Sequence, residues 1–81
     1  MAKSSSVHKN NKFLIDLGNT IRNLRIQQGF SQESLALAAE LDRSYVGGIE
    51  RGEHNLTIMN LLKISKALNI QPYELLKKIK V

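Results

Sequence analysis

Three polar side chains, Arg43, Ser44 and Tyr45, follow Asp42 at the start of a predicted short helix. Arginine can donate two hydrogen bonds to the O6 and N7 atoms of guanine, and serine can donate or accept one. Tyr45 offers a ring for a thymine methyl group and a hydroxyl for a phosphate or a base. Gathered at one helix end, these side chains have the chemistry needed to read base edges in a DNA major groove.

Further polar residues flank this cluster and suit contacts with phosphates. Gln32 stands at the start of another predicted helix, where exposed N–H groups bind phosphate. After the reading cluster, Gly52 provides a turn, and the polar residues around it are Arg51, His54, Asn55 and Thr57.

Three of these residues also have structural alternatives. Arg51 can form an ion pair with Glu33 or Glu50, Thr57 can cap the next helix, and Asn55 can make the turn. For Arg51 and Thr57 the structural role has at least as much support as a DNA contact.

Five helices are predicted to position these side chains, and no strand-like alternation occurs. The expected ranges are 12–28, 32–39, 43–50, 58–68 and 72–79. The last four share a start signal in which apolar residues lie one before and four after a candidate cap, which is the hydrophobic staple. The sets are Phe30-Ser31-Leu35, Leu41-Asp42-Val46, Leu56-Thr57-Leu61 and Ile70-Gln71-Leu75. Gln71 is a poor cap, but Pro72 suits the first helical position.

Each helix has a predicted inward face. In the first helix, apolar residues recur every three or four positions, while Arg22 and Arg25 are expected to face outward. That stripe consists of Leu14, Leu17, Ile21 and Leu24. In the later helices, the expected inward residues are Leu35, Ala36, Ala39, Val46, Ile49, Leu61, Leu62, Ile64 and Leu68. The fold class is therefore all-α, with one compact core.

The helices 32–39 and 43–50, separated by a short turn, form a helix-turn-helix unit. In such units the second helix lies in the major groove and reads base edges with its first residues. Gly47 and Gly48 lie within that second helix, where each costs about 1 kcal/mol relative to alanine. Either they permit close approach to another helix or to DNA, or the helix frays near its end.

Composition narrows the class of protein. The 81 residues make one domain, and 12 Lys and Arg against 7 Asp and Glu give a net charge of +5, which favours an anionic partner. No cysteine, long apolar span or secretory leader is present, so we expect a cytoplasmic protein with no membrane partner. Residues 1–11 are expected to form a disordered basic arm, and residues 12–81 the helix-turn-helix and dimerisation domain.

Catalysis and cofactor binding have little support. The carboxylates are scattered, and the chain lacks a glycine-rich phosphate loop and a metal-spaced histidine pair. Ser44 and His54 do not make a convincing catalytic dyad. We therefore expect a protein that is not an enzyme and binds neither a metal nor a cofactor.

The last predicted helix carries more apolar surface than one short helix needs. Leu75 is the staple residue and is expected inside. Leu76, Ile79 and Tyr73 then form a patch for a second subunit. The alternative is a monomer in which all of them close the core.

Most of the chain, residues 18–76, resembles the Cro/C1-type (XRE-like) helix-turn-helix domain. The motifs are IRxLRxxxGxSQExLA, a turn, IERG and LxKISKALNI. Within that superfamily, LDRSYVGGIERGEHNLTI is most similar to the controller proteins of bacterial restriction–modification systems. Two positions depart from the pattern: Gly47 replaces a Ser or acidic residue, and His54 replaces an Arg.

The resemblance implies a lambda-repressor-like fold of five helices and a homodimer formed mainly by the last two. It implies a transcription regulator that binds a pseudo-palindromic operator governing its own gene and the endonuclease gene, with RNA polymerase as a further candidate partner. By this resemblance Arg43, Ser44 and Tyr45 read bases, and Gln32, His54, Asn55 and Thr57 lie near phosphates. The alternatives are a phage-type repressor, or an antitoxin or adaptor that uses the fold mainly to bind a protein.

Overall fold

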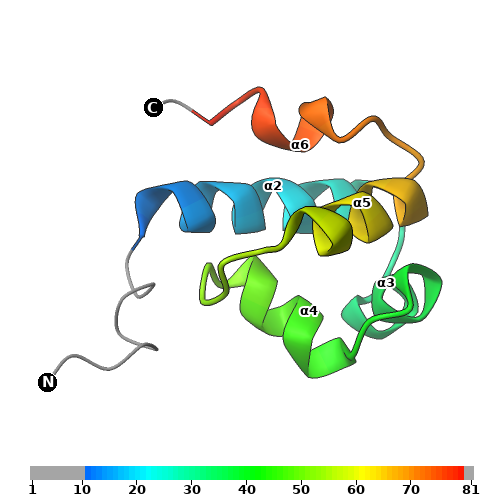
Figure 1. Cartoon of the computed structure of the whole chain (residues 1–81). Coiled ribbons are helices and arrows are strands. Elements are labelled where there is room, and N and C mark those ends of the chain that lie inside the picture. Colours follow the sequence, from blue (N-terminus) through cyan, green and yellow to red (C-terminus); the bar gives the residue numbers. More distant parts are fainter. Residues whose placement is uncertain (1–10, 80–81) are drawn as a thin grey trace, which may run out of the picture.

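The computed structural model describes residues 11–79, which form five α-helices, as the sequence predicts (Figure 1). They are α2 (Lys12–Gln27), α3 (Gln32–Ala39), α4 (Arg43–Glu50), α5 (Ile58–Ala67) and α6 (Tyr73–Leu76). Residues 1–10 of the predicted basic arm lie outside the described residues. Asn11, assigned to that arm from the sequence, is the N-cap of α2, and its side chain accepts hydrogen bonds from the N–H groups of Phe13 and Leu14.

The predicted caps explain why α3, α4 and α5 begin where they do. Ser31 accepts from the Ser34 N–H at 2.9 Å, and the Ser34 hydroxyl in turn accepts from the Ser31 N–H at 2.8 Å, which makes a reciprocal capping box. Asp42 caps α4 by accepting from the Ser44 N–H, and Thr57 caps α5 by accepting from the Asn60 N–H. These side chains satisfy N–H groups that have no partner inside the helix, so they fix each start.

Helix α6 is much shorter than the predicted range 72–79. It begins at Tyr73, with Pro72 rather than Gln71 in the capping position, and ends at Leu76. Beyond it the Ile79 N–H donates to the Leu76 carbonyl at 3.0 Å, a bond across three residues that tightens the last turn. This turn places Ile79, half-buried, against the core.

One core joins all five helices. Its buried apolar residues are Leu17, Ile21, Leu35, Ala36, Ala39, Val46, Ile49, Leu61, Ile64, Leu68 and Leu75. The predicted inward face is confirmed except at Leu62, which is 41% exposed. Successive residues lie about 100° apart around a helix, so Leu62 cannot share the face that Leu61 and Ile64 occupy. Leu14 and Leu24 are only partly buried.

The prediction that Arg25 faces outward is wrong, whereas Arg22 is exposed as expected. Arg25 lies four residues after Ile21, so it extends the buried stripe of α2 toward α4. There it is 9% exposed and forms an ion pair with Glu50. The apolar stripe of α2 did not reveal that Arg25 lies on the buried face, because the acid that accommodates its charge comes from another helix.

Helix α2 runs between α6 on one side and the α3–α4 pair on the other (Figure 1). Gly18 allows the close crossing of α2 over α4, because a Cβ atom at this position would lie 2.3 Å from the Ile49 carbonyl oxygen. Gly52, with φ of +77°, turns the chain directly against Ile15 of α2. The C-terminal end of α4 is therefore held firmly against α2. Among residues 11–79, no helix is long and apolar enough to cross a membrane.

Candidate nucleic-acid interface

The N-terminal end of α4 presents Arg43 and Ser44 to solvent, as the sequence analysis expects. Asp42 caps the helix by accepting from the Ser44 N–H at 3.1 Å, and the Ser44 hydroxyl also donates to this carboxylate. The side-chain hydrogen bond from Ser44, followed by the backbone bond, holds the pKa of Asp42 below its ordinary value. The cap engages the Ser44 hydroxyl hydrogen, so its oxygen is left to act as an acceptor.

Tyr45 is more constrained than its two neighbours. It is half-buried against the core, and its hydroxyl accepts a hydrogen bond from the Asn60 side chain of α5 at 2.9 Å. Its ring also lies 4.9 Å, between centroids, from the ring of His54, at an angle of 46°. Asn60 and His54 therefore fix the direction of Tyr45. The sequence gives no sign of the Asn60 contact, because the two residues belong to different helices and no local spacing pairs them.

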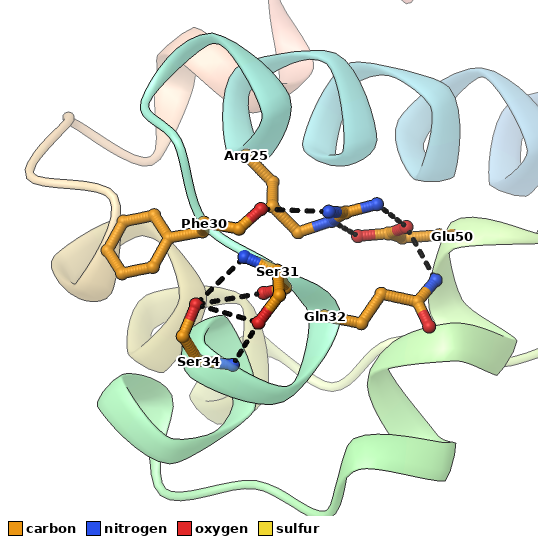
Figure 2. Close-up of polar contacts among 6 residues, drawn as sticks. All are labelled: Arg25, Phe30, Ser31, Gln32, Ser34 and Glu50. Atoms are coloured by element: carbon orange, nitrogen blue, oxygen red, sulfur yellow. Dashed lines mark hydrogen bonds and ion pairs between the residues drawn. The ribbon is translucent and has the colours of Figure 1, made fainter.

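Glu50, the last residue of α4, connects three parts of the fold (Figure 2). Its carboxylate accepts from Arg25 Nε at 2.7 Å, from Arg25 Nη2 at 3.1 Å and from Gln32 Nε2 at 3.0 Å. Arg25 also donates to the Phe30 carbonyl at 2.9 Å. The network thus ties α2, the loop before α3 and the end of α4 together, and sequence reasoning missed it.

Gln32, a predicted phosphate contact, is drawn into this network. Its amide nitrogen is used by Glu50, so its side chain presents the amide oxygen, an acceptor, toward Gly47. A phosphate can only accept hydrogen bonds, and the backbone N–H groups of the first turn of α3 offer it donors beside the second N–H of the Gln32 amide. The capping box uses the backbone N–H groups of Ser31 and Ser34. It leaves the backbone N–H groups of Gln32 and Glu33 for a ligand.

Arg51 pairs with neither of the acids named from the sequence. Glu50 is occupied by Arg25, and the Arg51 guanidinium instead binds Glu53, from Nε at 2.9 Å and from Nη2 at 3.2 Å. The hydrogen bonds and the charge of Glu53 raise the pKa of Arg51 above its ordinary value. Both side chains are more than half exposed.

Gly47 and Gly48 serve close approach, and α4 continues as a regular helix through Glu50. The nearest approaching groups are side chains that follow the helix, and the Gln32 side chain of α3 also lies beside Gly47. A Cβ atom on Gly47 would lie 3.2 Å from Arg51 Nη1, and one on Gly48 would lie 2.5 Å from His54 Nε2. Both glycines are buried beneath these side chains.

The remaining two candidates lie in the loop before α5. Thr57 accepts from the Asn60 N–H at 3.1 Å, so it has the structural role that the sequence allows, as the cap of α5. Asn55 is exposed. The structure thus brings His54 to Tyr45, and it places Arg51 and Gln32 beside Gly47. Among the hydrogen bonds of residues 11–79, none joins Asn55 or Thr57 to any of these four residues.

Exposed large apolar residues gather on the last two helices. Tyr73 is 62% exposed and Leu76 is 43% exposed, while Ile79 packs partly against its own core. The other exposed residues of this kind on these helices are Ile58, Met59 and Leu62, all on α5. Sequence reasoning missed these three. The adjacent apolar pairs 58–59 and 61–62 are a usable signal, because one short helix cannot bury both members of each pair.

Comparison with known proteins places this geometry in a family. A family model described as helix-turn-helix matches residues 21–75. The chain is 42% identical over 67 residues to control protein C.BamHI of Bacillus amyloliquefaciens, covering 82% of this chain and 83% of that protein.

Two solved structures extend the comparison. The restriction–modification controller protein C.AhdI from Aeromonas hydrophila superposes with a TM-score of 0.76 at 52% identity, covering 76% of this chain and 94% of that one. The structure of C.Esp1396I bound to a 19 base pair DNA duplex superposes with a TM-score of 0.76 at 36% identity, covering 83% of this chain and 89% of that one. The chain therefore belongs to the Cro/C1-type helix-turn-helix family, in which these similar members are restriction–modification controller proteins.

Proposed function

We propose that this protein is a sequence-specific DNA-binding transcription regulator of the controller type, which binds a pseudo-palindromic operator as a homodimer. The observation that carries the proposal is the position of Arg43 and Ser44, exposed at the free end of a helix whose other end is anchored by Glu50. A reading helix needs this combination, because base recognition depends on side chains held in a fixed place. The DNA-bound structure of the similar C.Esp1396I supports it.

In the proposed complex, Arg43 contacts a guanine, and Ser44 and Tyr45 contact neighbouring base edges. The N-terminal turn of α3 and the residues His54, Asn55 and Thr57 meet the phosphate backbone. The net charge of +5 favours this association through counterion release. The regulated genes are those of the protein itself and of an endonuclease, and the protein acts in the cytoplasm by binding rather than by catalysis.

The reading role is tested by binding to the DNA upstream of the protein's own gene. Arg43→Ala should weaken binding by about 1–3 kcal/mol and relax the preference for one base. Arg22→Ala is the matched control, because it removes the same charge from an exposed position on α2. If Arg43→Ala binds with unchanged affinity and base preference, Arg43 does not read the operator.

The proposed dimer buries apolar residues of α5 and α6. Five of the eight exposed large apolar residues among residues 11–79 lie there, although a small helical domain gains nothing from exposing them to water. A two-fold dimer would hold two reading helices about 34 Å apart, one turn of DNA. Leu62→Glu should shift sedimentation toward the monomer, whereas Leu37→Glu, at an exposed position on α3, should not. Wild-type protein that sediments as a monomer at high concentration would contradict the dimer.

A further inference from the structure

Two consecutive glycines on α4 leave space that two side chains of the loop after the helix fill. Arg51 lies over Gly47 and His54 lies over Gly48, and both glycines are buried although neither belongs to the apolar core. Glycines within a helix lower its stability. Here they allow the loop side chains to fold back along the helix instead of extending away from it.

The space beside Gly47 allows Arg51 to lie on the face of α4 that also carries Arg43, the proposed reading face. Residues four apart lie on the same face of a helix, so Arg43, Gly47 and Arg51 form one line along α4. The guanidinium of Arg51 reaches back along this line, since its Nη1 would lie 3.2 Å from a Cβ on Gly47. Any longer side chain at position 47 would occupy the space between the two arginines.

The two hydrogen bonds that Arg51 donates to Glu53 can be replaced by two hydrogen bonds to a base. Its fork of Nε and Nη2 binds the two carboxylate oxygens of Glu53, and this is the geometry in which an arginine fork meets two adjacent acceptors. Guanine offers such a pair in its O6 and N7 atoms. The Arg51 side chain is 61% exposed and that of Glu53 is 52% exposed, and ion pairs this open to water contribute little to stability.

We propose that Arg51 is a second base-reading residue, which contacts a guanine through the space left by Gly47 and is positioned before binding by Glu53. This inference rests on the proposed function and replaces the phosphate contact expected for Arg51 from the sequence. The two arginines at either end of the glycine then read separate base pairs of each half-site.

The test is selection of binding sites from a pool of duplexes with randomised half-sites, using the full-length dimer. Arg51→Ala should lose the preference for guanine at one position by about tenfold or more, as a lost bidentate contact does. Arg43→Ala should lose preference at a different position. Glu53→Gln, which keeps the shape but weakens the hold on Arg51, should reduce the same preference as Arg51→Ala by a smaller factor.

Gly47→Ala provides a variant that is expected to fold, because alanine has the higher helix propensity and the nearest atom is the end of a flexible side chain. Its methyl group would lie 3.2 Å from Arg51 Nη1, so it should shift the guanidinium slightly and reduce the same base preference. In the Arg51→Ala background the same substitution should have no further effect on that preference. Thermal unfolding of each variant checks that the fold is retained.

Two results would overturn the inference. In the first, Arg51→Ala weakens binding to all sequences equally and lowers the salt slope by about one, as loss of a phosphate contact does. In the second, Gly47→Ala leaves the selected sequences unchanged. If the wild-type protein selects no sequence at all, the proposed function itself is wrong, and this inference with it.

Discussion

Removing the Glu50 carboxylate should destabilise the protein more than any substitution on the reading face. The Glu50 side chain is 1% exposed, and it accepts two hydrogen bonds from Arg25 and one from Gln32. Loss of one partner from a buried ion pair leaves the other charge uncompensated, at a cost of about 3–5 kcal/mol. A chain of 81 residues has a total stability of roughly 4–12 kcal/mol, so Glu50→Ala should remove a large part of it.

Urea unfolding of wild-type, Glu50→Ala, Arg25→Met and the double variant Arg25→Met/Glu50→Leu measures the effect. The double variant replaces both charges with apolar groups of similar size, so it should regain most of the stability lost in either single variant. It will not regain all of it, because the Phe30 carbonyl also loses its Arg25 donor. All samples need the same protein concentration, since dimer formation would couple stability to concentration.

The reasoning is refuted if the single variants lose less than about 1 kcal/mol, which is the behaviour of a pair exposed to water. It is also refuted if the loss in the double variant equals the sum of the single losses, because the two side chains would then contribute independently.

Three further predictions concern the supports of α4. Gly18→Ala should lower the free energy of unfolding by about 1–3 kcal/mol, because the added methyl meets the rigid Ile49 carbonyl; urea unfolding beside Gly47→Ala is the comparison, and equal stabilities would contradict the crossing. The pKa of Asp42 is lowered on folding, so its carboxylate should stabilise the folded state above pH 3.8, its ordinary pKa, and this stabilisation should be lost as the pH falls through the pKa of the folded state. The free energy of unfolding, measured across this pH range, should show this loss in the wild type and not in Asp42→Asn. Asn60→Ala and Tyr45→Phe each remove one hydrogen bond and should each cost about 0.5–1.5 kcal/mol, with no added loss when combined; additive losses would show that the bond is not formed in solution.

Local signals predicted the helix-turn-helix unit well. Ser31 and Asp42 are caps whose partners lie within three residues, so the starts of α3 and α4 follow from neighbouring sequence alone. The pattern that predicted a longer α6 was less informative, because Leu75, Leu76 and Ile79 have spacing that fits a helix as well as a helix followed by a tight turn.

Contacts between distant residues could not be predicted in the same way. Arg25 meets Glu50 across 25 positions of the chain, and Asn60 meets Tyr45 across 15. No periodicity encodes such pairs, since they depend on how the helices cross. Arg51 shows the same limit, because the sequence analysis named Glu33 and Glu50 as its partners, whereas the path of the loop brings it to Glu53.

The two ends of α4 differ in what they contact, and this difference has a consequence for how such a regulator can diverge. Residues 46–50 are all buried and carry the fold, whereas residues 42–44 are exposed and touch little besides their own cap. If Arg43 and Ser44 read bases as proposed, substitutions there can alter the preferred operator at almost no cost in stability. A duplicated copy of the gene could acquire a new target site by drift at these positions alone, while its helices remain constrained by the core.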